Sequence, residues 1–457
     1  MGNGWHGKSV LVLGLGDTGL SALRWLSRRG ARLRAADTRE APPALGKVRE
    51  EHPHVEVVLG PFEQALLEGV DTVLASPGVA LREPVLQAAL CRGIEVLGDV
   101  EVFARELAHA APGARVIGIT GTNGKSTVTA LVAAMGAQAG WRSRAVGNIG
   151  VPVLDLLDDP GFGETELLAI ELSSYQLETT SSLALDAATM LNLSQDHMDR
   201  YDSMADYAHA KERIFARAGR RVVNRDDSWS RAMADGASLS FGLGEPRGDR
   251  EWGLDAAQRV LRWGDYDLVA VEDMSMKGLH NAANGLAAHA LATAVGASPE
   301  ALAKALREFK GLPHRVELVA QARGVRFFDD SKGTNVGASV AALDGFQSPV
   351  VLIAGGDGKG QDFSPLAAAV KARARAVVLL GRDGPAIGAA LAATDVPQLR
   401  VSTMEEAVEA AFACAHEGDA VLLSPACASF DMFRNYGHRG EVFAAAARAL
   451  ASRGEGH

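Results

Sequence analysis

The most constraining feature of the sequence is a pattern that occurs three times: a short apolar run, a glycine-rich turn, and an alanine- and leucine-rich stretch of helical character. The apolar runs, each followed directly by its turn, are residues 9–13, 115–120 and 350–354. Strands that alternate with helices predict parallel sheets with helices on both faces. We therefore expect an α/β protein with three domains, each built on a mostly parallel sheet.

The length of 457 residues also fits about three domains. Stretches rich in proline and glycine at residues 108–113 and 310–314 precede fresh strand patterns and indicate boundaries. The predicted domains are residues 1–107, 108–312 and 313–457. Residues 241–270 carry clustered charge and glycine, and the pattern predicts little there.

Charge and cysteine content exclude several classes of protein. The net charge of −10 argues against a general nucleic-acid binder, which needs a basic face. Only three cysteines occur, Cys91, Cys414 and Cys427, and their wide spacing is typical of reduced thiols in a cytosol. The N-terminus lacks the order of a signal peptide, and no apolar stretch is long enough to span a membrane. We expect a cytoplasmic monomer whose partners are small molecules.

The central glycine-rich turn indicates phosphate binding. Residues 121–126 follow a predicted strand and precede a helix, so backbone N–H groups there can face a phosphate chain. Lys125 would reach the outer phosphates, and the Ser126 hydroxyl would face Mg²⁺. Ile119 stands where the full P-loop pattern has a glycine, so only the shorter Gly-x-x-Gly-Lys-Ser core is present. A chance turn is the alternative to ATP binding.

The first glycine-rich turn, residues 14–19, matches a dinucleotide fingerprint. Asp37 follows at about the distance at which an acidic residue binds a ribose. By itself the motif fits NAD, the diphosphate of another nucleotide, or a simple tight turn.

Three further residues could surround a metal ion. Glu171 ends the apolar run 167–170, and a carboxylate at the end of a buried strand can hold Mg²⁺, although it could equally begin a helix. His197 lies in a polar loop, where a lone histidine is usually structural. Lys211 lies in the helix-like stretch 204–215 and by default would face solvent.

The last motifs suit anionic ligands. Asn284 precedes or caps a helix, and Arg315 could stabilise developing phosphoryl charge. Residues 330–335, Asp-Ser-Lys-Gly-Thr-Asn, follow a predicted strand and suit a carboxylate or zwitterion better than a core. Ser429 follows another apolar run and could instead be a helix N-cap.

Taken in this order over residues 8–447, the motifs resemble the Mur ligase family. The stretch 330–335 is most similar to the members that add D-glutamate, whereas sibling ligases tend to carry an Asp-Tyr-Ala-His-x-Pro-like stretch there. The resemblance implies a Rossmann-like domain for a UDP substrate, a central P-loop ATPase-like domain, and a Rossmann-like C-terminal domain for the amino acid. It replaces NAD by UDP at the first turn.

The resemblance also implies an activity: ATP-dependent addition of D-glutamate to UDP-N-acetylmuramoyl-L-alanine through an acyl phosphate, in peptidoglycan precursor synthesis. The implied cofactors are ATP, two Mg²⁺ ions and a CO₂-derived carbamate on Lys211. A carbamate is an anionic oxygen donor, which would explain a lysine among metal ligands.

Matching positions carry the implied roles. ATP would contact Gly121, Asn123, Gly124, Lys125, Ser126, Thr127, Asn284, Arg315 and Asp330. The UDP substrate would contact Gly16, Thr18, Asp37, Thr38, Arg39, Ser76, Pro77, Gly78, Asn148 and His197. D-glutamate would contact Lys332, Thr334, Lys359, Ser429, Phe430 and Tyr436. The metal would be held by Ser126, Glu171, His197 and carbamylated Lys211, and catalysis would use Lys125, Glu171, His197, Lys211 and Arg315.

The sequence departs from the family pattern at a few positions. Phe430 stands where a leucine is common, and Tyr436 where a phenylalanine is common; both keep a large apolar group that can reshape the amino-acid pocket. The pair at 194–195 before Asp196 and His197 is also a variant.

Three alternatives remain at this point. One is a ligase of the same chemistry with another substrate, such as a different muramyl ligase or a folate polyglutamating enzyme. Another is a nucleotide-dependent oxidoreductase, which would leave the Gly-Lys-Ser loop without a role. The third is a non-catalytic nucleotide sensor, which the intact lysines and acids disfavour.

Overall fold

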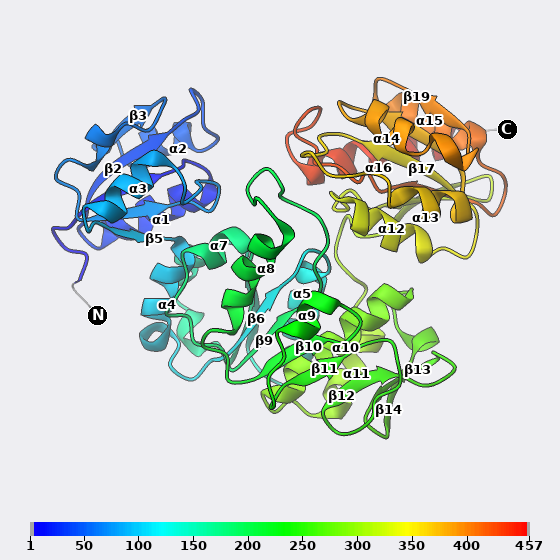
Figure 1. The fold of residues 1–457 in the computed structure, drawn as a ribbon, viewed down its shortest axis with the longest axis horizontal. Helices are drawn as coiled ribbons and strands as arrows, with labels where there is room; N and C mark the ends of the chain where they lie inside the picture. The colour runs from blue at the N-terminus through cyan, green and yellow to red at the C-terminus, as the bar shows by residue number, and fades with distance from the viewer. Residues whose placement is uncertain (1–3, 455–457) are drawn as a thin grey trace. The chain divides into compact units, whose positions relative to one another are not determined.

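The computed structural model describes residues 4–454, which form three sheets in succession along the chain (Figure 1). The chain divides into two compact units. The first runs to Asn192 and adds Ala205–Val269 and Gly285–Arg307; the second contains Leu193–Met204, Ala270–Asn284 and the chain from Glu308 onward. Within residues 4–454, every helix is too short or too polar to cross a lipid bilayer.

The N-terminal sheet is fully parallel, with the strand order β3-β2-β1-β4-β5. Its strands are β1 (Ser9–Leu13), β2 (Arg32–Asp37), β3 (Glu56–Leu59), β4 (Thr72–Ala75) and β5 (Glu95–Leu97). Its helices are α1 (Asp17–Arg28), α2 (Leu45–Glu51), η1 (Gln64–Leu67), α3 (Pro84–Cys91) and α4 (Asp99–Ala110). Because the strand order reverses beside β1, the turn after β1 lies at the point where such sheets bind ligands.

The central sheet has the order β14-β13-β12-β11-β10-β9-β6-β8-β7. Its strands are β6 (Arg115–Thr120), β7 (Ser143–Gly147), β8 (Leu167–Glu171), β9 (Ala187–Met190), β10 (Arg221–Asn224), β11 (Leu239–Phe241), β12 (Glu251–Leu254), β13 (Val260–Trp263) and β14 (Tyr266–Ala270). The pairs from β7 to β12 are parallel, and β12 pairs with β13 antiparallel. Residues 241–270 therefore extend this sheet at one edge.

Helices and 3₁₀ turns connect the central strands. They are α5 (Lys125–Gln138), α6 (Val153–Leu156), η2 (Phe162–Glu164), α7 (Ser174–Glu178), α8 (Met204–Glu212), η3 (Arg213–Phe215), α9 (Ser228–Ala232), η4 (Val271–Asp273), α10 (Leu279–Ala294) and α11 (Pro299–Glu308). Since β6 lies between β8 and β9, the loops after these three strands meet at one edge of the sheet.

The C-terminal sheet has the order β15-β16-β20-β17-β18-β19 and is parallel except for the β15–β16 pair. Its strands are β15 (Glu317–Ala322), β16 (Val325–Asp329), β17 (Val350–Gly355), β18 (Ala374–Leu380), β19 (Gln398–Arg400) and β20 (Ala420–Leu423). Its helices are α12 (Val336–Asp344), α13 (Leu366–Arg373), α14 (Gly384–Ala390), η5 (Ala392–Thr394), α15 (Met404–Cys414) and α16 (Tyr436–Gly454).

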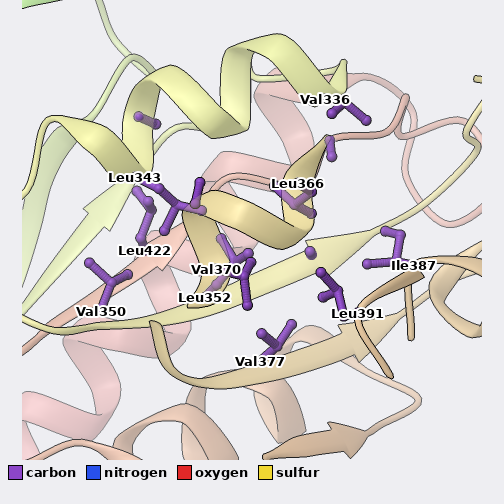
Figure 2. Close-up of a cluster of buried hydrophobic side chains, with 14 of the residues drawn as sticks. Val336, Leu343, Val350, Leu352, Leu366, Val370, Val377, Ile387, Leu391 and Leu422 are labelled. Atoms are coloured by element: carbon purple, nitrogen blue, oxygen red, sulfur yellow. The ribbon is translucent and has the colours of Figure 1, made fainter. Parts of the chain in front are cut away.

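Apolar side chains of β17 alternate between two cores. Val350 and Leu352 pack in the cluster of Figure 2, which Leu366 of α13 and Leu343 of α12 also join. Val351 packs in the cluster on the other face, with residues of α15 and α16. This double burial explains why β17 reads as a continuous apolar run. With a mostly parallel sheet in each of its three parts, the predicted fold class is confirmed.

Candidate functional site

The glycine-rich turn between β6 and α5 adopts a conformation that only glycine adopts readily. Gly121 and Gly124 have φ angles of 145° and 83°. A Cβ added at Gly121 would lie 3.0 Å from the Cβ of Leu191. The turn therefore places the N-terminus of α5 at the carboxyl edge of the sheet, a geometry that binds phosphate.

Two lysines donate hydrogen bonds to carbonyl oxygens of this turn. Lys125 Nζ donates to the carbonyl oxygens of Gly121 and Thr122, at 3.0 and 2.9 Å. Lys211 Nζ donates to the same Gly121 oxygen at 2.9 Å and lies 4.6 Å from the ring centroid of Tyr207. Lys211 is only 1% exposed, so its default interpretation as a solvated residue on a helix face is wrong.

Glu171 carries a carboxylate oxygen that no other group within residues 4–454 binds. This last residue of β8 is 1% exposed, and its Oε1 accepts a hydrogen bond from Asn148 Nδ2 at 3.0 Å. Its Oε2 is buried without a hydrogen-bond partner among the described residues. Burying an unpaired carboxylate oxygen is costly, and a hard cation would satisfy it. Glu171 therefore fits a Mg²⁺ ligand, and the buried Ser126 lies in the first turn of α5, which follows the neighbouring strand β6.

The first glycine-rich turn gathers several of the predicted UDP contacts. Ser76 Oγ donates to the Gly14 carbonyl at 3.0 Å, and the Asp37 carboxylate accepts from the Leu15 amide at 2.7 Å and from Arg39 at 2.6 Å. Burial opposes ionisation of Asp37, but these hydrogen bonds outweigh it and lower its pKa to about 2. A permanently charged Asp37–Arg39 pair thus lies beside the turn.

In the C-terminal domain, predicted ligand residues follow neighbouring strands. Lys332 and Thr334 follow β16, Lys359 follows β17, and Ser429 follows β20. Lys332 Nζ lies 3.8 Å from the ring centroid of Tyr436. Cationic and hydroxyl groups at one edge of the sheet suit a ligand with carboxylates.

Asp330 occupies an unusual environment beside these residues. Its Oδ2 accepts a hydrogen bond from Ser424 Oγ at 2.7 Å. Burial raises the pKa of Asp330 to about 7, although the hydrogen bond and the Arg315 charge act in the opposite direction. The carboxyl group can therefore change protonation near neutral pH.

The predicted residues are divided between the two units. The first holds Gly16, Thr18, Asp37, Thr38, Arg39, Ser76, Pro77, Gly78, Gly121, Asn123, Gly124, Lys125, Ser126, Thr127, Asn148, Glu171 and Lys211. The second holds His197, Asn284, Arg315, Asp330, Lys332, Thr334, Lys359, Ser429, Phe430 and Tyr436. Asn284 Nδ2 donates to Asn281 at 3.2 Å, and Phe430 is 74% exposed.

Sequence reasoning missed two groups in the second unit. Asp196 lies 3.2 Å from Lys359 Nζ and accepts from Asn335 Nδ2 at 3.4 Å, so it orders two loops of the C-terminal domain. Its position directly before His197 was the only available signal.

Arg439 of α16 is 1% exposed and donates to both Ser331 and the Cys427 carbonyl. It lies in an alanine-rich helix that no motif marks.

A third missed feature is the trio His314, Glu317 and Asp329, whose potential metal-ligating atoms lie within 4.8 Å of one another. His314 Nδ1 and Asp329 Oδ2 are 2.6 Å apart and form a hydrogen-bonded pair. The His314 ring also stands edge-on to Tyr436, with centroids 6.1 Å apart. The pair therefore supports the aromatic residue that contacts Lys332.

Models of three known domains together match most of the chain. The Mur ligase MurD-like N-terminal domain matches residues 8–98. The Mur ligase middle domain matches residues 119–292, and the Mur ligase glutamate ligase domain matches residues 314–427.

Close relatives share most of their length with this chain. The UDP-N-acetylmuramoylalanine–D-glutamate ligase of Methylobacillus flagellatus is 56% identical over 448 residues, which cover 97% of each chain. The protein of the same name from Nitrosomonas europaea is 52% identical and covers 98% of this chain and 97% of its own.

Solved structures share the fold at low identity. The UDP-N-acetylmuramate–alanine ligase of Thermotoga maritima superposes with a TM-score of 0.61 at 18% identity, covering 98% of this chain and all of its own. A pseudomurein peptide ligase type C from Methanothermus fervidus gives a TM-score of 0.59 at 18% identity, covering 91% and 96%.

Proposed function

The chain belongs to the Mur ligase family, and from this premise we propose that it joins D-glutamate to UDP-N-acetylmuramoyl-L-alanine using ATP, in peptidoglycan precursor synthesis. The observation that carries the proposal is identity above one half, over nearly the full chain, to ligases named for this reaction. Its substrates are small molecules: ATP, the UDP-linked acceptor and an amino acid. We place the enzyme in the cytoplasm as a monomer.

The reaction requires activation of the acceptor, because a free carboxylate does not form an amide in water. An oxygen of the L-alanyl carboxylate attacks the γ-phosphorus of ATP, the bond to the β-phosphate oxygen breaks, and ADP leaves. The amine of D-glutamate then attacks the acyl carbon, the carbon–oxygen bond to phosphate breaks, and the nitrogen gives up a proton. An acyl phosphate reacts readily with water, so the site must exclude it.

Cationic groups would compensate the negative charge during phosphoryl transfer. The N-terminus of α5 would bind the phosphate chain, and Lys125 would leave the Gly121 and Thr122 carbonyls to meet the outer phosphates. Arg315 would offset further negative charge. The attacking carboxylate and the phosphate chain are both anions and repel each other. Oriented cations reduce this repulsion and so lower the activation barrier of phosphoryl transfer.

The metal ligands in the proposal are Ser126, Glu171, His197 and Lys211. Two Mg²⁺ ions, when bound, would neutralise phosphate oxygens. The unsatisfied Oε2 of Glu171 supports this assignment. For Lys211, the neutral amine would attack CO₂ and lose a proton, which converts a cation into an anionic oxygen donor. The burial of Lys211 below the phosphate-binding turn supports that exchange of charge.

The C-terminal domain would select D-glutamate. Lys332 and Lys359 provide ammonium groups for the two carboxylates, and Thr334 and Ser429 provide hydroxyl donors. Tyr436 holds the Lys332 ammonium against its ring face. Phe430 is largely exposed and would form an apolar wall when the ligand binds.

The acyl phosphate can be tested directly with an acceptor that carries ¹⁸O in its L-alanyl carboxylate. Each turnover with ATP and D-glutamate should transfer one ¹⁸O atom to inorganic phosphate and increase the mass of the UDP product by one glutamyl residue. Reactions without D-glutamate and without ATP are the controls. Amide product formed together with unlabelled phosphate would contradict the mechanism, and absence of product would contradict the function.

A further inference from the structure

Asn192, a residue with no role assigned above, forms hydrogen bonds to the glycine-rich turn between β6 and α5. The side-chain Oδ1 of Asn192 accepts a hydrogen bond from the Asn123 amide at 2.8 Å. Its Nδ2 donates to the Asn123 carbonyl at 3.1 Å. The backbone carbonyl of Asn192 accepts from the Thr122 amide at 2.9 Å. One residue therefore pairs with backbone groups of two successive residues of the turn.

These contacts continue the parallel pairing of β6 with β9 beyond both strand ends. Met190 is the partner of Thr120 in the sheet, and the Leu191 amide donates to the Thr120 carbonyl at 2.9 Å. A Cβ on Gly121 would also lie 3.3 Å from the Asn192 amide nitrogen. The turn thus rests closely on the backbone of Leu191 and Asn192, and the side chain of Asn192 completes the contact.

We infer that Asn192 is a positioning residue for ATP: it fixes the backbone of the turn so that the N-terminus of α5 is directed at the β- and γ-phosphates. The inference rests on the proposed ATP-dependent reaction. The Asn123 N–H donates to Asn192, so this backbone group is already engaged and the phosphates would be bound by other donors of the turn. The other backbone N–H groups of the turn are thereby held in a fixed orientation.

The side-chain chemistry explains why an asparagine suits this position. A carboxamide carries both a donor and an acceptor, and it can pair with both the backbone N–H and the backbone C=O of one residue. Alanine would lose both hydrogen bonds. An aspartate would keep the acceptor for the Asn123 amide, but it would place an anionic oxygen against the Asn123 carbonyl and near the phosphates.

The test compares full-length Asn192→Ala with the unaltered chain. The KM for ATP should rise about tenfold to a hundredfold, as two lost hydrogen bonds predict. The KM values for D-glutamate and the UDP acceptor should not change. AMP lacks the outer phosphates, so its Kd, measured by calorimetry, should not change either. An unchanged KM for ATP, or an equal loss of AMP and ATP binding, would overturn the inference.

Asn224→Ala is the matched control. Asn224 Nδ2 donates to the Leu191 carbonyl at 2.8 Å and its Oδ1 accepts from the Asp226 amide at 2.9 Å, so this variant also loses two hydrogen bonds beside the same segment. It does not contact the turn through them and should leave the KM for ATP unchanged. An equal rise in both variants would show general loosening and overturn the inference.

The isosteric Asn192→Asp variant carries the test if the alanine variant does not fold. It should weaken ATP more than AMP, and equal affinity for ATP in Asn192→Asp and the unaltered chain would refute the role. If the unaltered chain itself fails to bind ATP, the proposed function fails. If the unaltered chain binds ATP and the variants match it, only the inference about Asn192 fails.

Discussion

Replacing Arg439 with lysine should loosen the two loops predicted to bind D-glutamate while the other substrate sites keep their affinity. Arg439 lies on α16 and is 1% exposed. Its Nε and two terminal nitrogens donate to Ser331 Oγ at 2.9 Å, to the Cys427 carbonyl at 3.0 Å and to the Ser331 carbonyl at 2.7 Å. The guanidinium therefore ties the loop of Lys332 to the loop of Ser429.

The magnitude follows from these contacts. A hydrogen bond from a charged group contributes about 1.5–3 kcal/mol, and the single nitrogen of lysine cannot reproduce the three directions of a guanidinium. Loss of one or two bonds should destabilise the C-terminal domain by about 2–4 kcal/mol. Burial already lowers the pKa of Arg439 to about 10, so a lysine there would also hold its charge less firmly. If about 1.4 kcal/mol of the loss affects loop order, affinity for D-glutamate falls about tenfold.

Steady-state kinetics with each substrate varied in turn provides the assay. Arg439→Lys should raise the KM for D-glutamate and leave the KM values for ATP and the UDP acceptor unchanged, with a lower thermal midpoint. Arg448→Lys is the control, because Arg448 lies on the same helix, is exposed, and makes one hydrogen bond of 3.3 Å to the Val319 carbonyl. An unchanged KM for D-glutamate in a destabilised Arg439→Lys protein would refute the reasoning.

Three further outcomes are expected. Lys211→Ala should lose most activity, by about a hundredfold, and formate or acetate should partly restore it; full activity of the unaided variant in the phosphate-release assay would exclude the carbamate. Glu171→Gln should raise the Mg²⁺ concentration needed for half-maximal rate by about tenfold or more, and an unchanged Mg²⁺ titration would remove Glu171 from the metal site. Burial lowers the pKa of His289 from 6.5 to about 3, so the native state binds this proton less well than the unfolded state. The free energy of unfolding should therefore fall as pH decreases from 6.5 toward 3, by up to about 1.4 kcal/mol per pH unit. His289→Gln keeps an acceptor for the Trp252 indole and should flatten this pH dependence in thermal melts, whereas an unchanged slope would assign the acid sensitivity elsewhere.

The three strand–turn–helix modules could be predicted because local signals agree there. The predicted runs 9–13 and 115–120 coincide with β1 and β6, since β-branched residues bounded by glycine favour buried parallel strands. The Gly121 turn forms although Ile119 departs from the full P-loop pattern, because only the positions with positive φ require glycine. The domain boundaries and the roles of individual site residues stay predictions.

Other features depend on tertiary contacts that no local pattern encodes. The alanine-rich sequence of α8 has no clear apolar face, so the burial of Lys211 could not be foreseen. The edge strands within residues 241–270 expose charged groups such as the Arg262–Asp267 pair. These charges obscure the alternation of apolar and polar residues by which a strand is predicted. Arg439 and Asn192 form hydrogen bonds to backbone groups that are far away in sequence, Ser331 and Asn123, and single motifs carry no such information.

ATP-dependent phosphate release with UDP-N-acetylmuramoyl-L-alanine tests the central claim most directly, with D-glutamate, L-glutamate, meso-diaminopimelate and L-lysine compared under Mg²⁺ and bicarbonate. Release with D-glutamate alone is the predicted result. Release with another amino acid would contradict the assigned specificity while keeping the ligase chemistry, and no release with any of the four would contradict the proposed acceptor itself.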